Sequence, residues 1–180
     1  MTIYFTADTH FKHKKILQYC NRPFATIDDH DEMLVHNWNA IVKPKDKVYI
    51  IGDFMFSRNR EEIKAVTQRL NGSKFLILGN HDHQDICQDL FEWVKNYYVL
   101  IAHNIRWVLF HYPILEWDGW WRTKGSIHLY GHIHNRSENK DTPPHIQFLN
   151  TQNGCFNVGV DVNNFAPVSA LTLARRFKKP

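Results

Sequence analysis

The sequence predicts an α/β fold with a largely parallel central sheet and helices outside it. Two observations predict this class. Short runs of β-branched and aromatic residues alternate with amphipathic helical stretches along the first half of the 180-residue chain. Hydrophobic residues make up 43% of the composition, which is enough for a packed core between layers of secondary structure. We therefore expect one domain over residues 1–180, with right-handed crossovers between parallel strands.

The first strand is expected over Ile3–Ala7, and it runs directly into Asp8-Thr9-His10. Asp8 and His10 are two residues apart, so in an extended chain they lie on the same face and can reach one ion. The alternative is a turn aspartate beside a surface histidine. A short helix is expected over Lys14–Tyr19, and Pro23 ends it because proline lacks the backbone donor.

A longer helix is expected to begin at Thr26 or Asp28, because acidic residues crowd its first turn, where the helix dipole favours them. Its expected core-facing stripe consists of Met33, Leu34, Trp38 and Ile41. His30 and His36 lie off this stripe, and we expect both to be solvated.

Two further strands repeat the pattern of a core strand followed by polar residues. The strand Val48–Ile51 ends in Gly52-Asp53, and after a connecting helix the strand Phe75–Leu78 ends in Gly79-Asn80-His81-Asp82. In open α/β sheets, ligands bind beyond the carboxyl ends of the strands, which makes these polar residues site candidates. The alternative for the second segment is a simple turn, because Gly-Asn is a common turn pair.

The second half of the chain is expected to contain more strands than helices. The expected elements are a short helix at Asp85–Val94 and strands at Tyr97–Ala102, Trp107–Phe110, Ile127–Tyr130, Phe156–Val162 and Ala170–Ala174. The second of these strands ends in His111, and the third ends in Gly131-His132-Ile133-His134. Residues 112–125, which are rich in tryptophan, and the polar residues 135–153 are expected to be loops.

Charge and cysteine content restrict the class of protein. A net charge of +4 permits a phosphate-bearing partner but is too small for a nucleic-acid-binding signature. The three scattered cysteines form no C-x-x-C pair, which argues against a disulfide framework or a thiolate zinc site. The sequence contains neither a signal peptide nor a run of 18 apolar residues, so we expect a soluble cytoplasmic protein without a membrane partner.

Five expected strand ends therefore carry oxygen and nitrogen ligands. They are Asp8/His10, Asp53, Asn80/His81, His111 and His132/His134. Such a set without thiolates suits divalent manganese, iron, zinc, nickel or magnesium. It is large enough for two ions, and two ions about 3.5 to 4 Å apart can clamp both sides of a phosphoryl displacement.

These motifs, in this order between residues 8 and 134, resemble those of the calcineurin-like metallophosphoesterase family, and the small size is similar to that of its compact bacterial and phage members. The resemblance implies a two-sheet β-sandwich flanked by helices. It also implies a two-metal-dependent phosphoesterase that hydrolyses a phosphate monoester or diester, with a phosphorylated small molecule or nucleotide as substrate.

The resemblance also implies residue roles. One ion would be held by Asp8, His10 and His134, the other by Asn80, His111 and His132, and Asp53 would bridge them. A hydroxide between the ions would be the nucleophile. His81 would be a catalytic residue that is not a ligand, protonating the leaving group, with Asp82 orienting its ring.

The residues that contact the substrate are expected outside the ligand motifs. Many family members carry Asp-Arg or Asn-Arg soon after the Gly-Asp motif, and this sequence departs from that pattern. Arg58 or Arg60 is a candidate for binding phosphate, with an exposed helix surface as the alternative. Arg22, Arg122 and Lys124 are further candidates.

Two other functions are considered. A nuclease or nucleotide phosphodiesterase would use Trp117, Trp120 and Trp121 to stack bases, although these side chains fit core or lid packing equally well. A catalytically silent binding scaffold would have lost metal ligands or His81, and all of these are present. An active phosphoesterase is therefore the leading interpretation.

Overall fold

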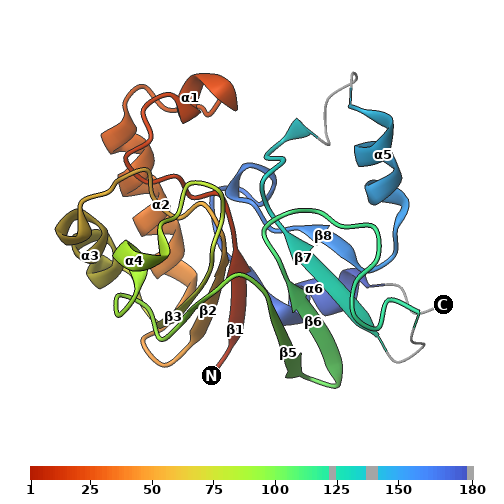
Figure 1. The fold of residues 1–180 in the computed structure, drawn as a ribbon. Helices are drawn as coiled ribbons and strands as arrows, with labels where there is room; N and C mark the ends of the chain where they lie inside the picture. The colour runs from red at the N-terminus through yellow and green to blue at the C-terminus, as the bar shows by residue number, and fades with distance from the viewer. Residues whose placement is uncertain (122–124, 137–141, 178–180) are drawn as a thin grey trace.

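The computed structural model of the protein describes residues 1–121, 125–136 and 142–177. Two β-sheets pack against each other, and helices cover their outer faces (Figure 1). The two-sheet sandwich with flanking helices that the family resemblance implied is therefore confirmed.

The first sheet has the strand order β4-β3-β2-β1-β9. Its strands are β1 (Ile3–Thr6), β2 (Lys47–Ile51), β3 (Ser73–Ile77), β4 (Val94–Lys95) and β9 (Val168–Ser169). β1 to β4 are parallel to their neighbours, and β9 pairs antiparallel with β1. The expected parallel arrangement of the first three strands is confirmed, so their carboxyl ends lie along one edge.

The second sheet has the order β5-β6-β7-β8. Its strands are β5 (Tyr98–Ala102), β6 (Ile105–Leu109), β7 (Ser126–Tyr130) and β8 (Cys155–Asn157). β5 and β6 form an antiparallel hairpin, whereas β6, β7 and β8 are parallel to one another. The ends of β6 and β7 therefore bring their following histidines to one edge of this sheet.

Most helices lie in the outer layers, whereas α6 packs against the core between the sheets through Ala170 and Leu173 (Figure 1). They are α1 (Ile16–Tyr19), α2 (Ile27–Ile41), α3 (Arg60–Arg69), α4 (Gln84–Cys87), α5 (Pro144–Thr151), the 3-10 helix η2 (Val160–Val162) and α6 (Ala170–Arg176). The start of α2 is fixed by Thr26, whose side chain accepts the backbone N–H of Asp29. No described helix is long and apolar enough to cross a lipid bilayer.

Alternating side chains of β2 explain why the strands are continuous apolar runs in the sequence. Val48 and Ile50 pack into the layer formed with α2 and α3, whereas Tyr49 and Ile51 pack into the layer between the two sheets. A strand covered on both faces needs apolar residues at every position. A third cluster, which includes Ile146 of α5, covers the outer face of the second sheet.

Several sequence-based expectations for α2 are wrong. His30 is fully buried because its ring nitrogens contact Arg22 and Asp31. Met33 and Ile41 are exposed, since the buried stripe of this helix instead includes Val35 with Leu34 and Trp38. The buried face is therefore rotated relative to the expected one.

Four expectations for the second half are also wrong. The helix expected over residues 85–94 shrinks to α4, because residues 94 and 95 pair with β3. The expected loop at 135–153 contains α5, which starts at Pro144 and buries Ile146. The last expected strand is helix α6, which Ser169 caps by accepting the N–H of Thr172, and the strand expected at 156–162 ends at Asn157.

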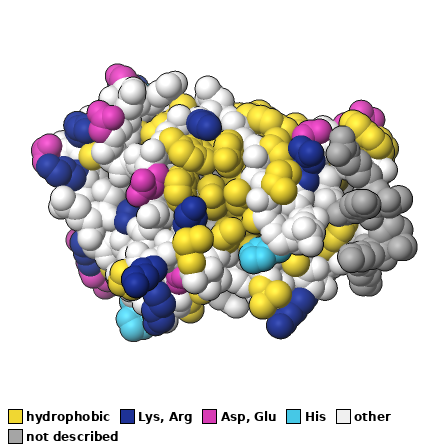
Figure 2. Space-filling model, turned by 90° about the horizontal axis from the view of Figure 1, so that it is seen from below, with side chains coloured by type: hydrophobic (Ala, Val, Ile, Leu, Met, Phe, Trp, Pro, Cys, Tyr) yellow, Lys and Arg dark blue, Asp and Glu magenta, His cyan; other side chains and the backbone are white. Residues whose placement is uncertain are grey.

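The two ends of the sandwich differ in character. The carboxyl ends of β1, β2 and β3 lie at the upper end in Figure 1. Figure 2 shows the molecule from below, and hydrophobic side chains gather in the middle of that face, with lysine and arginine scattered around them. The candidate ligands lie at the upper end.

Candidate metal centre

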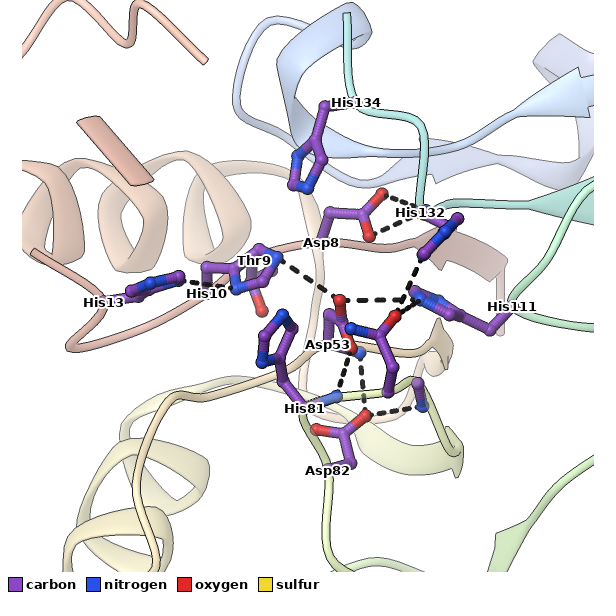
Figure 3. Close-up of polar contacts among 12 residues, drawn as sticks. Asp8, Thr9, His10, His13, Asp53, His81, Asp82, His111, His132 and His134 are labelled. Carbon is purple, nitrogen blue, oxygen red and sulfur yellow. Dashed lines mark hydrogen bonds and ion pairs between the residues drawn. The ribbon is translucent and has the colours of Figure 1, made fainter. Parts of the chain in front are cut away.

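The seven expected metal ligands converge on one region at the strand ends: Figure 3 labels six of them, and Asn80 contacts His111 and His132. Asp8 and His10 follow β1, Asp53 follows β2, Asn80 follows β3, His111 follows β6, and His132 and His134 follow β7. The structure therefore brings together residues that are spread along the sequence from position 8 to position 134.

The first group consists of Asp8, His10 and His134, whose ligand atoms all lie within 4.8 Å of one another. The rings of His10 and His134 are stacked with centroids 5.1 Å apart. His10 Nε2 is buried and has no hydrogen-bond partner among the described residues. An orphaned buried acceptor beside a carboxylate fits a cation, because a buried polar atom is costly when it is left unpaired.

The second group consists of Asn80, His111 and His132. Asn80 Oδ1 lies 3.1 Å from His111 Nε2 and 2.9 Å from His132 Nδ1. His111 Nδ1 lies 2.9 Å from the carbonyl of Ile51 and is therefore the donor, so Nε2 either carries a proton towards Asp53 or, when that proton leaves, offers its lone pair to an ion. Two lone-pair atoms facing each other at this distance also fit a cation between them.

Asp53 lies between the two groups. Its Oδ2 is 3.4 Å from His10 Nε2 and 3.5 Å from His111 Nε2, while its Oδ1 accepts the backbone N–H of His81 at 2.9 Å. Burial favours the protonated acid, but the hydrogen bond and charge of His111 outweigh it and hold the pKa of Asp53 well below its usual range. The carboxylate is therefore ionised and positioned where a bridging ligand would lie.

Asp8 is held rigidly in the centre of the cluster. Its two carboxylate oxygens accept the backbone N–H of His132 at 2.9 and 3.0 Å. Burial raises the pKa of Asp8 to about 6, against the lowering effect of the charge of His134. A Cβ at Gly131 would come within 2.6 Å of Asp8 Oδ2, and one at Gly159 within 2.7 Å, so the backbone closes tightly around this carboxylate.

Five of the seven ligands have left-handed backbone conformations. Their φ angles are 55° at Asp8, 50° at His10, 54° at Asp53, 70° at His132 and 51° at His134. Such angles are uncommon outside glycine and persist only where the surrounding structure imposes them. Backbone bonds from Asp8 N to the Gly52 carbonyl and from His10 N to the Asp53 carbonyl, both 3.0 Å, do so here.

Arg22, expected as a substrate contact, instead supports the cluster. Its five N–H groups point at Asp161 Oδ1 and Oδ2 (2.8 Å each), the carbonyls of Asp8 (2.7 Å) and Thr9 (3.1 Å), and His30 Nε2 (2.7 Å). The side chain is 0% exposed. No donor is left for a substrate, so the expected role of Arg22 is corrected to that of a clamp on the backbone that carries Asp8.

Asp161 is a site residue that the sequence analysis missed. Its Oδ2 lies 2.8 Å from His134 Nδ1, and Cys20, His134 and Asp161 together form another group of ligand atoms within 4.8 Å. Burial raises the pKa of Asp161, but the His134 hydrogen bond and the Arg22 charge outweigh it and lower the pKa to about 2. A carboxylate between Val160 and Val162 was the available signal, since a charge in an apolar run needs a partner.

Asp82 does not contact the His81 ring in the way expected. Its carboxylate accepts the backbone N–H groups of Asp53 (2.7 Å), Phe54 (3.0 Å) and Gly79 (2.9 Å). Dashed lines in Figure 3 join Asp82 to backbone nitrogens rather than to the imidazole. Asp82 therefore ties the end of β2 to the end of β3, and the expected Asp82–His81 side-chain pair is replaced by this arrangement.

The His81 ring lies beside the first ligand group. Its centroid is 5.2 Å from that of His10 and 5.8 Å from that of His13 (Figure 3). His13 was not expected at the site, and its Nδ1 lies 3.1 Å from His10 Nδ1. When His10 Nδ1 is the donor of this bond, His10 Nε2 keeps its lone pair for a cation. The spacing His10-x-x-His13 was the sequence signal.

Tyr112 was also missed. Its ring packs edge-on against His111 and His132, with centroids 5.0 and 4.7 Å away. An aromatic residue directly after a candidate ligand was the only sequence signal. Tyr112 therefore restrains two rings of the second group at once.

The remaining expected substrate contacts divide into three cases. Arg58 is exposed and lines a pocket of about 350 Å³ together with Asn80 and His81. Arg60 instead donates to the carbonyls of Ile86 and Gln88. Arg122 and Lys124 lie outside the described residues.

The chain is similar in sequence to a known protein family and to archaeal and phage proteins. A family model described as calcineurin-like phosphoesterase matches residues 1–152. An uncharacterized protein of Methanocaldococcus jannaschii is 32% identical over 98% of this chain and 92% of its own length. The Gene 66 protein of Mycobacterium phage L5 is 28% identical over 73% of this chain and 76% of its own length.

A solved structure shares the fold. The crystal structure of a protein of unknown function from Aquifex aeolicus superimposes with a TM-score of 0.77 at 23% identity, covering 97% of this chain and 98% of that one. At this identity the likeness concerns the arrangement of the strands and helices.

Proposed function

The chain belongs to the calcineurin-like phosphoesterase family, and from that premise we propose that it hydrolyses a phosphate monoester or diester with two divalent ions. Membership makes the chain a metal-dependent phosphoric ester hydrolase that acts on a phosphorylated substrate. We assign one ion to Asp8, His10 and His134 and the other to Asn80, His111 and His132, with Asp53 between them.

The position of Asp53 Oδ2 supports two ions most directly. It is nearly equidistant from His10 Nε2 (3.4 Å) and His111 Nε2 (3.5 Å), which belong to different ligand groups. An ion in the first group alone would pair His10 Nε2 but leave His111 Nε2 facing the oxygens of Asn80 and Asp53 with no cation among them. Two ions that share Asp53 would satisfy both.

The donor set favours hard or borderline ions. It contains carboxylate, amide and imidazole ligands without a thiolate, which suits manganese, iron, zinc, nickel or magnesium. Two ions held there would supply Lewis acidity to the phosphoryl oxygens and lower the pKa of a bound water towards neutrality. The chain itself supplies the fixed geometry, because backbone hydrogen bonds hold Asp8 and His10 in their left-handed conformations.

We assign His81 to proton transfer. Its ring lies 5.2 Å from that of His10, yet its side chain belongs to neither ligand group, so a ring nitrogen of His81 can hold a proton for the leaving oxygen. The backbone N–H of His81 donates to Asp53 Oδ1, which fixes the position of the residue relative to the ions. Asp82 supports this indirectly through the backbone of Asp53.

The test is hydrolysis of p-nitrophenyl phosphate and bis(p-nitrophenyl) phosphate by protein loaded with each of the five metals. We expect turnover in at least one metal, two ions per chain by elemental analysis, and loss of the second ion in Asp53→Asn. Absence of turnover above the Asp53→Asn background in every metal would disprove the proposal. One ion per active chain would disprove the two-ion part alone.

A nucleotide phosphodiesterase or nuclease is the second candidate, and the exposed tryptophans favour it. Trp120 and Trp121 are 46% and 66% exposed, whereas Trp117 is buried in the core cluster of the second sheet. Exposed indoles can stack bases, so oligonucleotides would compete with the chromogenic substrate. Competition by neither oligonucleotides nor mononucleotides would exclude this candidate. The silent scaffold has no support, since all expected ligands converge.

A further inference from the structure

A pocket lies next to His81, and most of the residues that line it have no role in the proposed metal centre. It has a volume of about 350 Å³ and is lined by Phe56, Ser57, Arg58, Asn80, His81 and His83. Asn80 and His81 belong both to this pocket and to the metal centre, so the two are adjacent. Part of a substrate bound at the ions can therefore reach this pocket.

Aromatic rings lead from the metal centre into this pocket. The His81 ring has the His10 ring at 5.2 Å on one side and the Phe56 ring at 5.5 Å on another. Phe56 is stacked on His13, with centroids 4.2 Å apart and planes within 15° of parallel. The stack fixes the plane of Phe56, although 51% of its surface remains exposed. A large, oriented and half-exposed ring is suited to stacking a second planar group.

Arg58 adds a positive charge to the same pocket. Within the described part of the chain, the structure gives Arg58 neither a hydrogen bond nor an ion pair, and the side chain is exposed. Arg22, by contrast, uses all its donors on Asp161, two carbonyls and His30, and Arg60 donates to the carbonyls of Ile86 and Gln88. A free guanidinium at the mouth of an aromatic pocket favours an anionic group there.

We propose that this pocket is the leaving-group subsite and that it takes a planar ring stacked on Phe56, with an anionic substituent bound by Arg58. This inference rests on the proposed phosphoesterase function, because His81 as proton donor places the leaving oxygen on the pocket side of the ions. A nucleotide has this combination of a flat base and a further phosphate. The chemical class of the substrate is therefore an aryl or nucleoside ester with a second negative charge, rather than a small alkyl phosphate.

Binding of stable phosphonates to the manganese-loaded protein tests the pocket separately from turnover. Isothermal titration would compare methylphosphonate, phenylphosphonate and 4-carboxyphenylphosphonate, which share the same anion at phosphorus. We expect phenylphosphonate to bind about tenfold more tightly than methylphosphonate, in the range typical of one stacked ring. We expect the added carboxylate to strengthen binding about threefold further, as one exposed ion pair does.

Matched variants assign these differences to residues. Phe56→Ala should remove the preference for the phenyl group, and Phe56→Leu, which keeps an apolar side chain without a ring plane, should remove most of it. Phe148→Ala, at a phenylalanine of equal exposure on α5, should keep it. Arg58→Gln should remove the gain from the carboxylate, whereas Arg175→Gln, at an exposed arginine on α6, should not.

The outcomes separate the two proposals. Equal affinity of the wild type for methylphosphonate and phenylphosphonate, or a phenyl preference that survives Phe56→Ala, would overturn the subsite even in an enzyme that turns over esters. A preference that Phe56→Ala removes, in a protein that hydrolyses no ester, would sustain the pocket and refute the proposed function instead.

Discussion

Asp161 Oδ2 lies 2.8 Å from His134 Nδ1, and the same carboxylate is paired with Arg22 through two bonds of 2.8 Å. Arg22 fills its other N–H positions with the carbonyls of Asp8 and Thr9 and with His30. One buried chain of charges therefore joins α2, η2 and two assigned ligands. It fixes Nδ1 of His134 as the donor, which leaves Nε2 free to bind an ion.

Removing this acceptor should weaken metal binding without removing a ligand. We expect Asp161→Asn to lower the affinity for one ion by about 10- to 100-fold, the usual effect of losing the partner that orients a ligating histidine. Titration of the metal-free protein with manganese measures it. Asp118→Asn, which alters a partly exposed carboxylate paired with Arg106, is the matched control. Unchanged affinity in Asp161→Asn would show that His134 needs no such partner.

Arg22 should matter for stability more than for substrate affinity. Arg22→Met leaves the buried Asp161 carboxylate without its cation, which typically costs about 3 to 5 kcal/mol. Urea unfolding of the metal-free protein measures the loss. The control Arg69→Met removes an exposed pair with Glu32 and should change stability far less, because solvent screens such a pair. A raised KM with unchanged stability in Arg22→Met would instead support the earlier expectation of a substrate contact.

The convergence of the candidate ligands was predictable from sequence because each one follows a strand end. A glycine or a strand boundary precedes Asp53, Asn80 and His132, and the strands themselves are recognisable as continuous apolar runs. Position along a parallel sheet then determines which side chains meet. The family motifs supplied the expected roles, which stay predictions, and the structure brings Asp8, His10 and His134 together in one group of ligand atoms and Asp8, Asp53 and His111 in another.

The supporting residues were not predictable, because their partners lie far away in the sequence. Arg22 precedes a proline in a polar stretch, and only its contact with Asp161, 139 positions later, explains its burial. His30 was misjudged for the same reason, since Arg22 is one of its partners. The helix α6 was read as a strand because Ala170–Ala174 is short and apolar, which periodicity alone does not resolve.

His81 should separate turnover from metal binding. We expect His81→Ala to keep both ions and to lower kcat by about 10² to 10⁴, the range for loss of a general acid. The loss should be largest for an alkyl ester and smallest for a p-nitrophenyl ester, because a good leaving group needs little protonation. Elemental analysis beside the rate measurement is the control. Loss of an ion in this variant, or an equal loss for both esters, would contradict the assignment.

His128 should make the protein less stable in acid, independently of the metal centre. It lies on β7 with Nδ1 3.2 Å from the carbonyl of Val108, while its Nε2 accepts the N–H of Ile114 at 3.4 Å. Burial lowers the pKa of His128 from its ordinary 6.5 to about 4, with its backbone hydrogen bonds opposing the shift. The folded chain therefore holds the ring neutral at a pH where the unfolded chain would protonate it.

The direction in which the free energy of unfolding changes with pH follows from this difference in proton binding. Above pH 6.5 the stabilisation from neutral His128 is fully present, and it is lost as the pH falls through the folded-state pKa near 4. Between pH 7 and 4 the free energy of unfolding should thus fall by roughly 3 kcal/mol more in the wild type than in His128→Gln. Urea titrations at several pH values measure this difference. The contribution of the titrating candidate metal ligands to the pH dependence cancels in the difference, because both proteins contain them. His36→Gln, at an exposed histidine, should follow the wild type, whereas parallel curves for the wild type and His128→Gln would show that burial does not depress this pKa.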